Sequence, residues 1–249
     1  MSKKRLLSHL TIGSWIQIGH PAVAEIMASA GFDWLAVDLE HSAITLREAE
    51  DLIRIIDIKG VIPFVRLSSN NPEQIKRVMD MGAHGVIVPM VKTPNEAQRA
   101  VKAVKYPPVG ERSIGLARAQ GYGAKFEHYF DWQAENTYVI VQIEHIKAVE
   151  NLREILSIPG IDGYIVGPYD LSGSIGKPGI FDDPEFLSAM GEIRRVSNEV
   201  GVPGGVHIVE PDRDALKACI DEGNTFIAYG VDTRMLDTVC RDGLKPIRA

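Results

Sequence analysis

The chain has 249 residues, of which 45% are hydrophobic and 24% charged, so it can fill the core of one α/β barrel. Its formal net charge is −6 and no basic stripe is visible, so we expect neither nucleic acid nor a membrane surface as a partner. With only Cys219 and Cys240, the chain fits a reducing compartment. The first 19 residues lack the apolar segment of a signal peptide, and no run approaches the roughly 18 apolar residues of a membrane helix. These features predict a cytoplasmic protein.

Short apolar runs alternate with amphipathic segments along the whole chain. We expect strands at 10–18, 34–39, 61–67, 85–89, 138–143, 164–166, 204–208 and 225–229. We expect helices at 21–30, 45–59, 71–81, 93–105, 146–156, 184–200, 212–222 and 233–240. Eight strand–helix units without a linker or a shift in composition predict a single domain, 1–249. Its class is α/β, and its fold a single (β/α)₈ TIM barrel.

One segment breaks this alternation. Residues 106–136 form the longest stretch with weak periodicity. Long loops inside a compact domain usually carry function, so we predict that this segment serves as a lid.

Two acids follow neighbouring strands in the segment 137–179, a strand–helix–strand unit. Glu144 ends the first apolar run and Asp170 follows the second. Barrel enzymes place their chemistry at the C-terminal ends of strands. Two carboxylates in one crevice repel, so they need a shared cation or one must hold a proton. Oxygen ligands suit Mg²⁺ or Mn²⁺, although two surface acids at the starts of loops are the alternative.

Other polar side chains fall at the same predicted rim: Glu40, His41, Arg66 and His207. His41 is either a base near neutral pH or a hydrogen-bonded structural residue. Arg66 lies in an apolar strand and needs an anion, which is a structural carboxylate or a bound substrate. His207 lines the pocket or packs beneath it, and Asp80, taken alone, is a solvated acid near a helix end.

Some kinds of site find little or no support. The glycine-rich loop from Gly167 to Gly179 offers backbone N–H groups for an anion, but such turns are common. No dinucleotide fingerprint or P-loop follows a strand. No lysine lies inside a predicted strand, where a Schiff-base aldolase would need one, and this favours a metal-dependent reaction.

The motifs WLAVDLEH, PFVRL, VIVQIE, GPYDLSGSIG and FIAYGVD occur in this order and span essentially the whole chain. Together they resemble the class II pyruvate aldolases, the family of 4-hydroxy-2-oxoheptanedioate aldolase and 2-dehydro-3-deoxyglucarate aldolase, which has citrate-lyase-like relatives. The combined motifs are specific for the family and not for one substrate.

The resemblance implies roles for individual residues. Glu144 and Asp170 would hold the divalent ion, Mg²⁺, Mn²⁺ or Co²⁺. His41 would be the general base, Asp80 would raise its basicity, and Arg66 would stabilise an enolate.

The resemblance also implies contacts with substrate and with other copies of the chain. Gln142 would contact pyruvate, and the backbone around Gly167–Asp170, which includes Tyr169, would hold its carboxylate. Tyr169 stands where relatives commonly carry a small residue, so we expect a narrower pocket beside the metal. The family forms homo-oligomers, usually hexamers built as trimers of dimers that exchange their last helices. The terminal helix 233–249 would then make oligomer contacts.

The function that follows is metal-dependent aldol cleavage. A 4-hydroxy-2-oxo acid would be split reversibly into pyruvate and an aldehyde, through a pyruvate enolate held at the metal. The alternatives are a carbon–carbon lyase or synthase acting on oxaloacetate or an acyl-CoA, and a non-catalytic barrel that binds oxo acids. The sequence shows no basic groove for a nucleotide, and a sensor would not need His41, Asp80 and Arg66.

Overall fold

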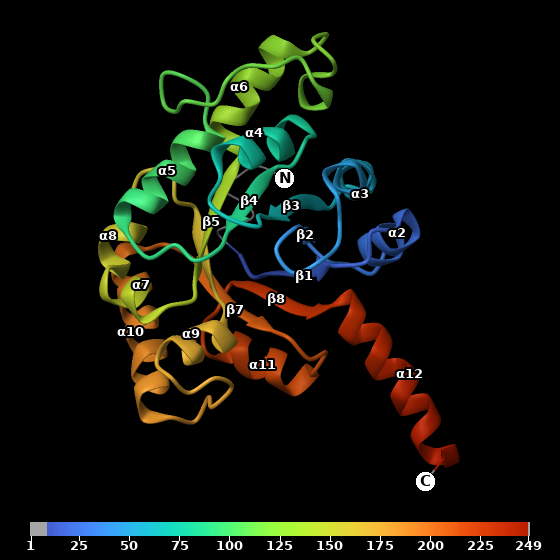
Figure 1. The fold of residues 1–249 in the computed structure, drawn as a ribbon, viewed down its shortest axis with the longest axis vertical. Helices are drawn as coiled ribbons and strands as arrows, with labels where there is room; N and C mark the ends of the chain where they lie inside the picture. The colour runs from blue at the N-terminus through green and yellow to red at the C-terminus, as the bar shows by residue number, and fades with distance from the viewer. Residues whose placement is uncertain (1–8, 249) are drawn as a thin grey trace.

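Eight parallel strands close into one barrel in their order along the chain, β1 to β8 (Figure 1). The computed structural model describes residues 9–248, with side chains described as far as residue 245. Residues 1–8 and residue 249, the two ends of the expected domain 1–249, lie outside the described part. The (β/α)₈ fold is confirmed. The strands are β1 Thr11–Ile16, β2 Trp34–Asp38, β3 Ile62–Arg66, β4 Gly85–Val88, β5 Tyr138–Ile143, β6 Gly163–Val166, β7 Gly204–Ile208 and β8 Phe226–Val231.

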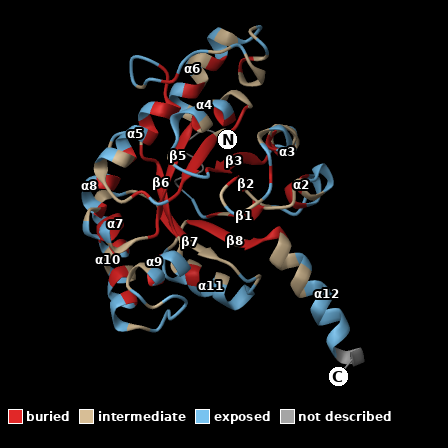
Figure 2. Cartoon of the chain, in the orientation of Figure 1, coloured by how far each residue is buried: buried red, intermediate tan, exposed pale blue. Residues whose placement is uncertain are grey.

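Helices cover the outside of the barrel, and the strands lie buried between them and the interior (Figure 2). Local sequence fixes several helix starts; Thr45, for example, forms a capping box with Glu48. The helices are α2 Pro21–Ala28, α3 Leu46–Ile58, α4 Pro72–Asp80, α5 Pro94–Val104, α6 Phe126–Asn136, α7 Ile146–Glu150, α8 Leu152–Leu156, α9 Pro168–Ser174, α10 Pro184–Val200, α11 Arg213–Asp221 and α12 Asp232–Arg248.

Aromatic side chains fill the N-terminal end of the barrel interior. Trp34 and Phe226 begin their strands and stack with ring centroids 4.5 Å apart, and Phe64 packs edge-on against both. Gly13 leaves room for this cluster, because a Cβ there would lie 1.9 Å from the Trp34 ring. The C-terminal end of the barrel is therefore the open end, from which a ligand can reach the interior.

The segment 106–136 is not a lid over the mouth of its own barrel. It connects α5 to β5 and so lies where strands begin, at the opposite end from Glu144. Arg118 anchors it there, donating to Asp57 at 2.7 Å and to the carbonyl of Met81 at 3.0 Å. The segment also contains helix α6, which weak periodicity concealed because only Tyr129 and Gln133 of that helix are buried.

Two other boundaries differ from expectation. The last helix, α12, is 17 residues long and continues past residue 240, where the helical pattern ended, through most of the expected terminal helix 233–249, and most of it extends away from the barrel (Figures 1 and 2). The expected glycine-rich loop begins as helix α9, which places Asp170 in a first helical turn. Within residues 9–248, none of the helices has the length and apolar character required to cross a membrane.

Candidate active site

A buried ion pair links the C-terminal ends of β2 and β3. Asp38 and Arg66 are the last residues of these strands and lie directly opposite each other in the sheet. Arg66 donates from Nε to Oδ1 of Asp38 at 2.9 Å and from Nη2 to Oδ2 at 2.5 Å. Its Cζ also lies 4.4 Å from the centroid of the Trp15 ring. Of the two partners considered for Arg66, the resting structure thus supplies the carboxylate, which sequence reasoning had not singled out.

The bidentate pair leaves one nitrogen of Arg66 available. Nη1 makes no hydrogen bond among the described residues, whereas Nε and Nη2 are committed to Asp38. A guanidinium fixed in this way presents a donor whose direction is set before a ligand arrives, which reduces the cost of ordering it.

Asp38 also orders the turn that follows β2. Its Oδ1 accepts the backbone N–H groups of Glu40 at 3.0 Å and His41 at 3.2 Å, and its Oδ2 accepts from Gln17 Nε2 at 2.9 Å. Burial alone would raise the pKa of Asp38, but the hydrogen bond and charge of Arg66 outweigh it and lower the pKa. Asp38 is therefore a fixed negative charge that positions both Arg66 and the His41 turn.

His41 stands at the opening, with 58% of its side chain exposed. Its Nε2 lies 3.6 Å from Oε2 of Glu40, an oxygen that is buried and has no hydrogen-bond partner. Burial raises the pKa of Glu40 to about 7, helped by the charges of Asp38 and Asp170 and opposed by Arg66. The ring of His41 can therefore be reached from solvent, while the carboxyl group beside it is held back in the barrel.

Glu144 lies deeper, just after β5, and is held by two donors. Gln142 Nε2 donates to its Oε1 at 2.8 Å, and the backbone N–H of Met90 donates to its Oε2 at 2.9 Å. Gly167 makes room for it, because a Cβ there would lie 2.6 Å from Oε1. Burial, helped by the charges of Glu40 and Asp170, raises the pKa of Glu144 to about 7 against the hydrogen bond from Met90 and the charge of Arg66.

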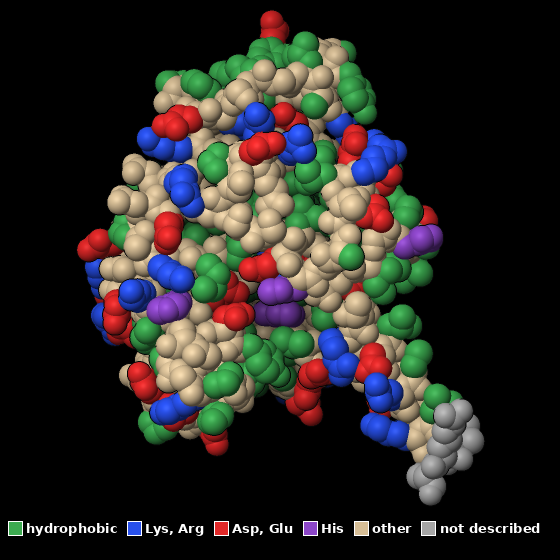
Figure 3. Space-filling model, in the orientation of Figure 1, with side chains coloured by type: hydrophobic (Ala, Val, Ile, Leu, Met, Phe, Trp, Pro, Cys, Tyr) green, Lys and Arg blue, Asp and Glu red, His purple; other side chains and the backbone are tan. Residues whose placement is uncertain are grey.

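Asp170 approaches the same space from the first turn of α9. It is exposed, and its side chain makes no hydrogen bond or ion pair among the residues described. Its charge raises the pKa of both Glu40 and Glu144, so the three carboxyl groups act on one another at the mouth. Figure 3 shows histidine and acidic side chains gathered near the middle of the face drawn.

The carboxylate and amide oxygens at the mouth are ligands that suit a hard divalent cation. Among residues 9–248, no three His, Cys, Asp or Glu side chains lie close enough to hold an ion by themselves. Glu144 and Asp170 could supply two ligands, and Mg²⁺ is usually bound by one or two carboxylates together with water and substrate oxygens. Gln142 Oε1 and Glu40 Oε2 are buried without a hydrogen-bond partner, and Glu40 Oε2 lies 3.6 Å from Arg66 Nε, so two further oxygen acceptors remain for a ligand to satisfy.

Asp80 is not near His41 within one chain, which corrects the expected pairing. A helix that follows a strand runs back toward the other end of the barrel, so the last residue of α4 lies far from the rim. There Asp80 accepts a hydrogen bond from Arg112 Nη2 at 3.1 Å.

His207 belongs to the wall below the rim. Its ring packs edge-on against Trp15 at 5.4 Å, and its Nε2 lies 3.3 Å from the carbonyl of Gly230. Burial and the positive charge of Arg66 lower its pKa to about 3, so it is neutral at physiological pH and does not relieve the excess of acids. No lysine occurs in the eight strands.

Comparison with known proteins identifies relatives along nearly the whole chain. The family model described as HpcH/HpaI aldolase/citrate lyase matches residues 11–238. The chain is 38% identical over 228 residues to a hydroxypyruvate/pyruvate aldolase of Sagittula stellata, covering 91% of this chain and 89% of that protein. It is 35% identical over 236 residues to a 2-keto-3-deoxy-L-rhamnonate aldolase of Escherichia coli, covering 94% and 87%.

A solved structure agrees with these matches. A family protein from Burkholderia cenocepacia aligns with a TM-score of 0.93 and 30% identity, covering 99% of this chain and 98% of that one.

The crowding of carboxyl groups predicts a pH-dependent response to Mg²⁺. Without a cation, Glu40 and Glu144 have pKa values near 7, above the usual 4.5, so the native state holds protons that the unfolded state releases. The cation-free protein should therefore lose stability as pH rises between about 4.5 and 7. Because Mg²⁺ binds the deprotonated groups, it should raise the melting temperature more at pH 8 than at pH 5.5.

Thermal unfolding in EDTA and in MgCl₂ at both pH values measures this effect. Asp170→Asn should abolish the Mg²⁺-dependent gain, whereas Glu154→Gln, at an exposed acid of α8, should retain it. An equal gain at both pH values, or one that survives in Asp170→Asn, would contradict the assignment.

Proposed function

Because the chain belongs to the HpcH/HpaI aldolase/citrate lyase family, we propose that it cleaves a 4-hydroxy-2-oxo acid reversibly into pyruvate and an aldehyde. The observation that carries this proposal is the arrangement of the mouth. Arg66 keeps one guanidinium nitrogen outside its pair with Asp38, its charge and that of Asp170 act on Glu144, and His41 stands exposed beside Glu40. These groups supply the parts of an enolate-forming reaction: a fixed positive donor, ligands for a cation, and an accessible base.

Binding of the 2-oxo acid would rely on donors already in place. Arg66 Nη1 would donate to the 2-oxo oxygen while Asp38 prevents the guanidinium from turning away. Gln142 and the backbone of residues 167–170 would contact the pyruvate half and its carboxylate. A divalent cation, Mg²⁺, Mn²⁺ or Co²⁺, held by Glu144 and Asp170 would supply further positive charge where negative charge develops.

His41 would act on the other half of the substrate. It would take the proton of the C4 hydroxyl as the C3–C4 bond breaks, which releases the aldehyde and leaves the bonding electrons in a pyruvate enolate. Arg66 would stabilise the enolate oxygen, the kind of term that is usually largest in catalysis. Protonation of the enolate at C3 then gives pyruvate.

Tyr169 would limit the size of the aldehyde. Its ring is 54% exposed beside Asp170 and packs edge-on against Phe181, with centroids 5.1 Å apart. Gly179 lies against the same ring, where a Cβ would come within 3.7 Å. An aromatic side chain supported from behind narrows the mouth more than a small residue would, so small aldehydes should fit best.

The role implied for Asp80 requires a second copy of the chain, because one chain keeps Asp80 at the other end of the barrel. Gly115 lies beside it, since a Cβ there would come 3.4 Å from Asp80 Oδ2, and the two residues next to Gly115 in the chain, Ile114 and Leu116, are 52% and 65% exposed. Such a surface suits burial against the rim of a neighbouring barrel.

Helix α12 supports the same assembly. Leu236, Val239 and Leu244 are 58%, 72% and 47% exposed and recur at helical spacing on a helix that leaves its own barrel (Figure 1). An apolar stripe of this kind needs a partner surface, and a second copy provides one. We infer a homo-oligomer on these grounds, with a hexamer as the form that the family resemblance favours.

Arg66 variants test the reaction through exchange of pyruvate methyl protons for deuterium, followed by NMR with Mg²⁺. Exchange and aldol cleavage share the enolate, so Arg66→Ala should slow both by roughly 10²–10³-fold, as loss of one oxyanion donor does. Arg66→Lys keeps the charge that Asp38 needs but loses the planar fork, and should slow both less severely.

His41→Ala separates the two halves of the reaction. Cleavage should fall by about 10²–10⁴-fold while pyruvate binding persists. If Arg66→Ala exchanged pyruvate protons at the wild-type rate but failed to cleave, Arg66 would act on the aldehyde half and not on the enolate. If the wild type neither exchanged nor cleaved, a binding protein would be favoured.

An aldehyde screen tests the role of Tyr169. The Tyr169→Ala variant should accept larger aldehydes than the wild type does.

Complementation tests the shared site. His41→Ala and Asp80→Asn should each be weakly active alone. When the two variants are co-expressed, random pairing in the oligomer should give about a quarter of the sites both wild-type residues and restore activity to that level. Activity no higher than that of either variant would show that Asp80 does not serve His41 across copies.

Light scattering on the same samples measures the assembly itself. The wild type should exceed the 27.4 kDa of one chain, and Leu236→Glu on α12 should lower the mass. A wild type that runs as a monomer would contradict the oligomer.

A further inference from the structure

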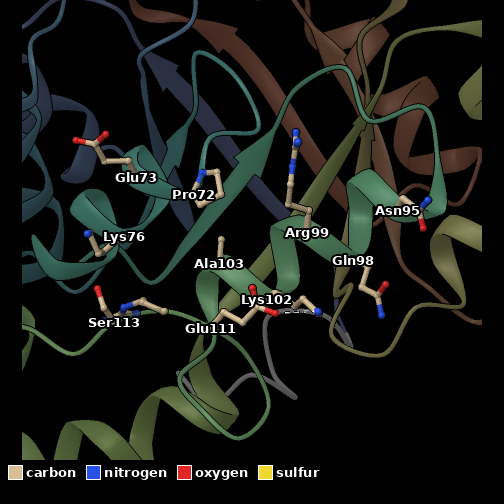
Figure 4. A pocket seen from close by; sticks show the side chains of 11 residues that line it. Pro72, Glu73, Lys76, Asn95, Gln98, Arg99, Lys102, Ala103, Glu111 and Ser113 are labelled. Atoms are coloured by element: carbon tan, nitrogen blue, oxygen red, sulfur yellow. Dashed lines mark hydrogen bonds and ion pairs between the residues drawn. The ribbon is translucent and has the colours of Figure 1, made fainter.

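A groove of about 700 Å³ runs along the outer surface between α4 and α5, away from the barrel interior (Figure 4). Residues 111–113, which follow α5, close one side of it. This segment is pinned to the end of α5: the N–H of Glu111 donates to the carbonyl of Lys102 at 2.7 Å, and that of Arg112 to the carbonyl of Lys105 at 3.0 Å. The walls of the groove are therefore two helices and a short backbone segment held in place by hydrogen bonds.

Positive side chains enter the groove from both helices. Lys76 comes from α4, and Arg99 and Lys102 come from α5. Lys102 is paired with Glu111 at 2.8 Å. Within the described part of the chain, Lys76 and Arg99 make neither an ion pair nor a hydrogen bond. A fourth cationic residue of the lining, Arg112, is paired with Asp80 at 3.1 Å, so the uncompensated positive charge of the groove is that of Lys76 and Arg99.

This positive charge contrasts with the net charge of the molecule, which is −6. Like charges placed across a groove repel each other, and an anion between them removes that repulsion. The mouth of the barrel shows the opposite balance, with carboxyl groups in excess, so it should attract a cation.

Residue 113 adds a donor without a partner, and residue 112 fixes the wall beside it. The side chain of Arg112 is fully buried, with its Nη1 and Nη2 bonded to Val104, Asp80, Tyr106 and Tyr129, so it anchors the segment and does not reach into the groove. Ser113 is exposed, and its hydroxyl makes no hydrogen bond among the described residues. This hydroxyl is therefore free to donate to a ligand in the groove.

We propose that this groove is a binding site for a small organic phosphate. Arginine, lysine and a hydroxyl are the groups that bind phosphate, through a planar fork, a point charge and a neutral donor. The groove lies within the range of about 300–1,000 Å³ typical of small-molecule sites and exceeds the size of a phosphate group alone. The ligand should therefore carry an organic part, which the amides of Asn95 and Gln98 would contact.

Equilibrium dialysis of the full-length protein with radiolabelled inorganic phosphate, with MgCl₂ present and pyruvate absent, tests the proposal. The wild type should bind saturably, glycerol 3-phosphate should compete more strongly than succinate, and binding should weaken with added NaCl. The double variant Lys76→Ala/Arg99→Ala should bind about tenfold more weakly or worse, because two charge-assisted hydrogen bonds are lost.

A matched control removes one arginine and one lysine elsewhere. Arg213 and Lys217 on α11 are exposed and make no ion pair among the described residues, so Arg213→Ala/Lys217→Ala should bind phosphate as the wild type does. Undetectable binding, equal binding by all three proteins, or stronger competition by succinate would overturn the proposal. Binding lost in Asp170→Asn but kept in the groove variant would place the phosphate at the mouth and also overturn it. None of these outcomes depends on aldol cleavage, so this proposal and the proposed function fail separately.

Discussion

Four carboxyl groups meet one guanidinium at the open end of the barrel, and this imbalance of charge governs the site. Asp38 accepts two hydrogen bonds from Arg66 in a buried position, and Glu40 lies 3.6 Å from the same guanidinium. Burial and the charges of neighbouring carboxylates, Asp170 among them, raise the pKa of Glu40 and of Glu144 against the charge of Arg66, and neutral His207 gives no relief. Crowded carboxylates that repel each other need a cation or protons, so the same constraint predicts both a bound metal and a pH-dependent affinity for it.

Much of this site could be predicted from the sequence because a parallel barrel brings all strand ends to one rim. Period-two and helical patterns located the eight strands closely enough to place Glu144, Asp170, Arg66 and His41 together. The structure bears out that gathering. The roles assigned to these residues came from resemblance to a family, and they remain predictions for this chain.

Other features depended on contacts that a linear pattern does not encode. Asp38 reads as one more residue of a buried strand, and only the register opposite Arg66 reveals the ion pair. The expected contact of Asp80 with His41 took no account of the direction of α4, which places Asp80 at the far end of the same barrel. The prediction that residues 106–136 cover the mouth was wrong for a similar reason, because a segment that precedes β5 lies at the end where strands begin. The groove between α4 and α5 combines side chains from separate segments, so no single stretch of sequence displays it.

The most direct test is the position of a metal in a crystal of the protein soaked with Mn²⁺ and pyruvate. The anomalous difference map should show one peak between Glu144 and Asp170, about 2.1 Å from an oxygen of each, with pyruvate oxygens completing the coordination. Arg66 should still be paired with Asp38 and should direct Nη1 at the 2-oxo oxygen. Manganese bound elsewhere, or pyruvate joined covalently to a lysine, would contradict the account.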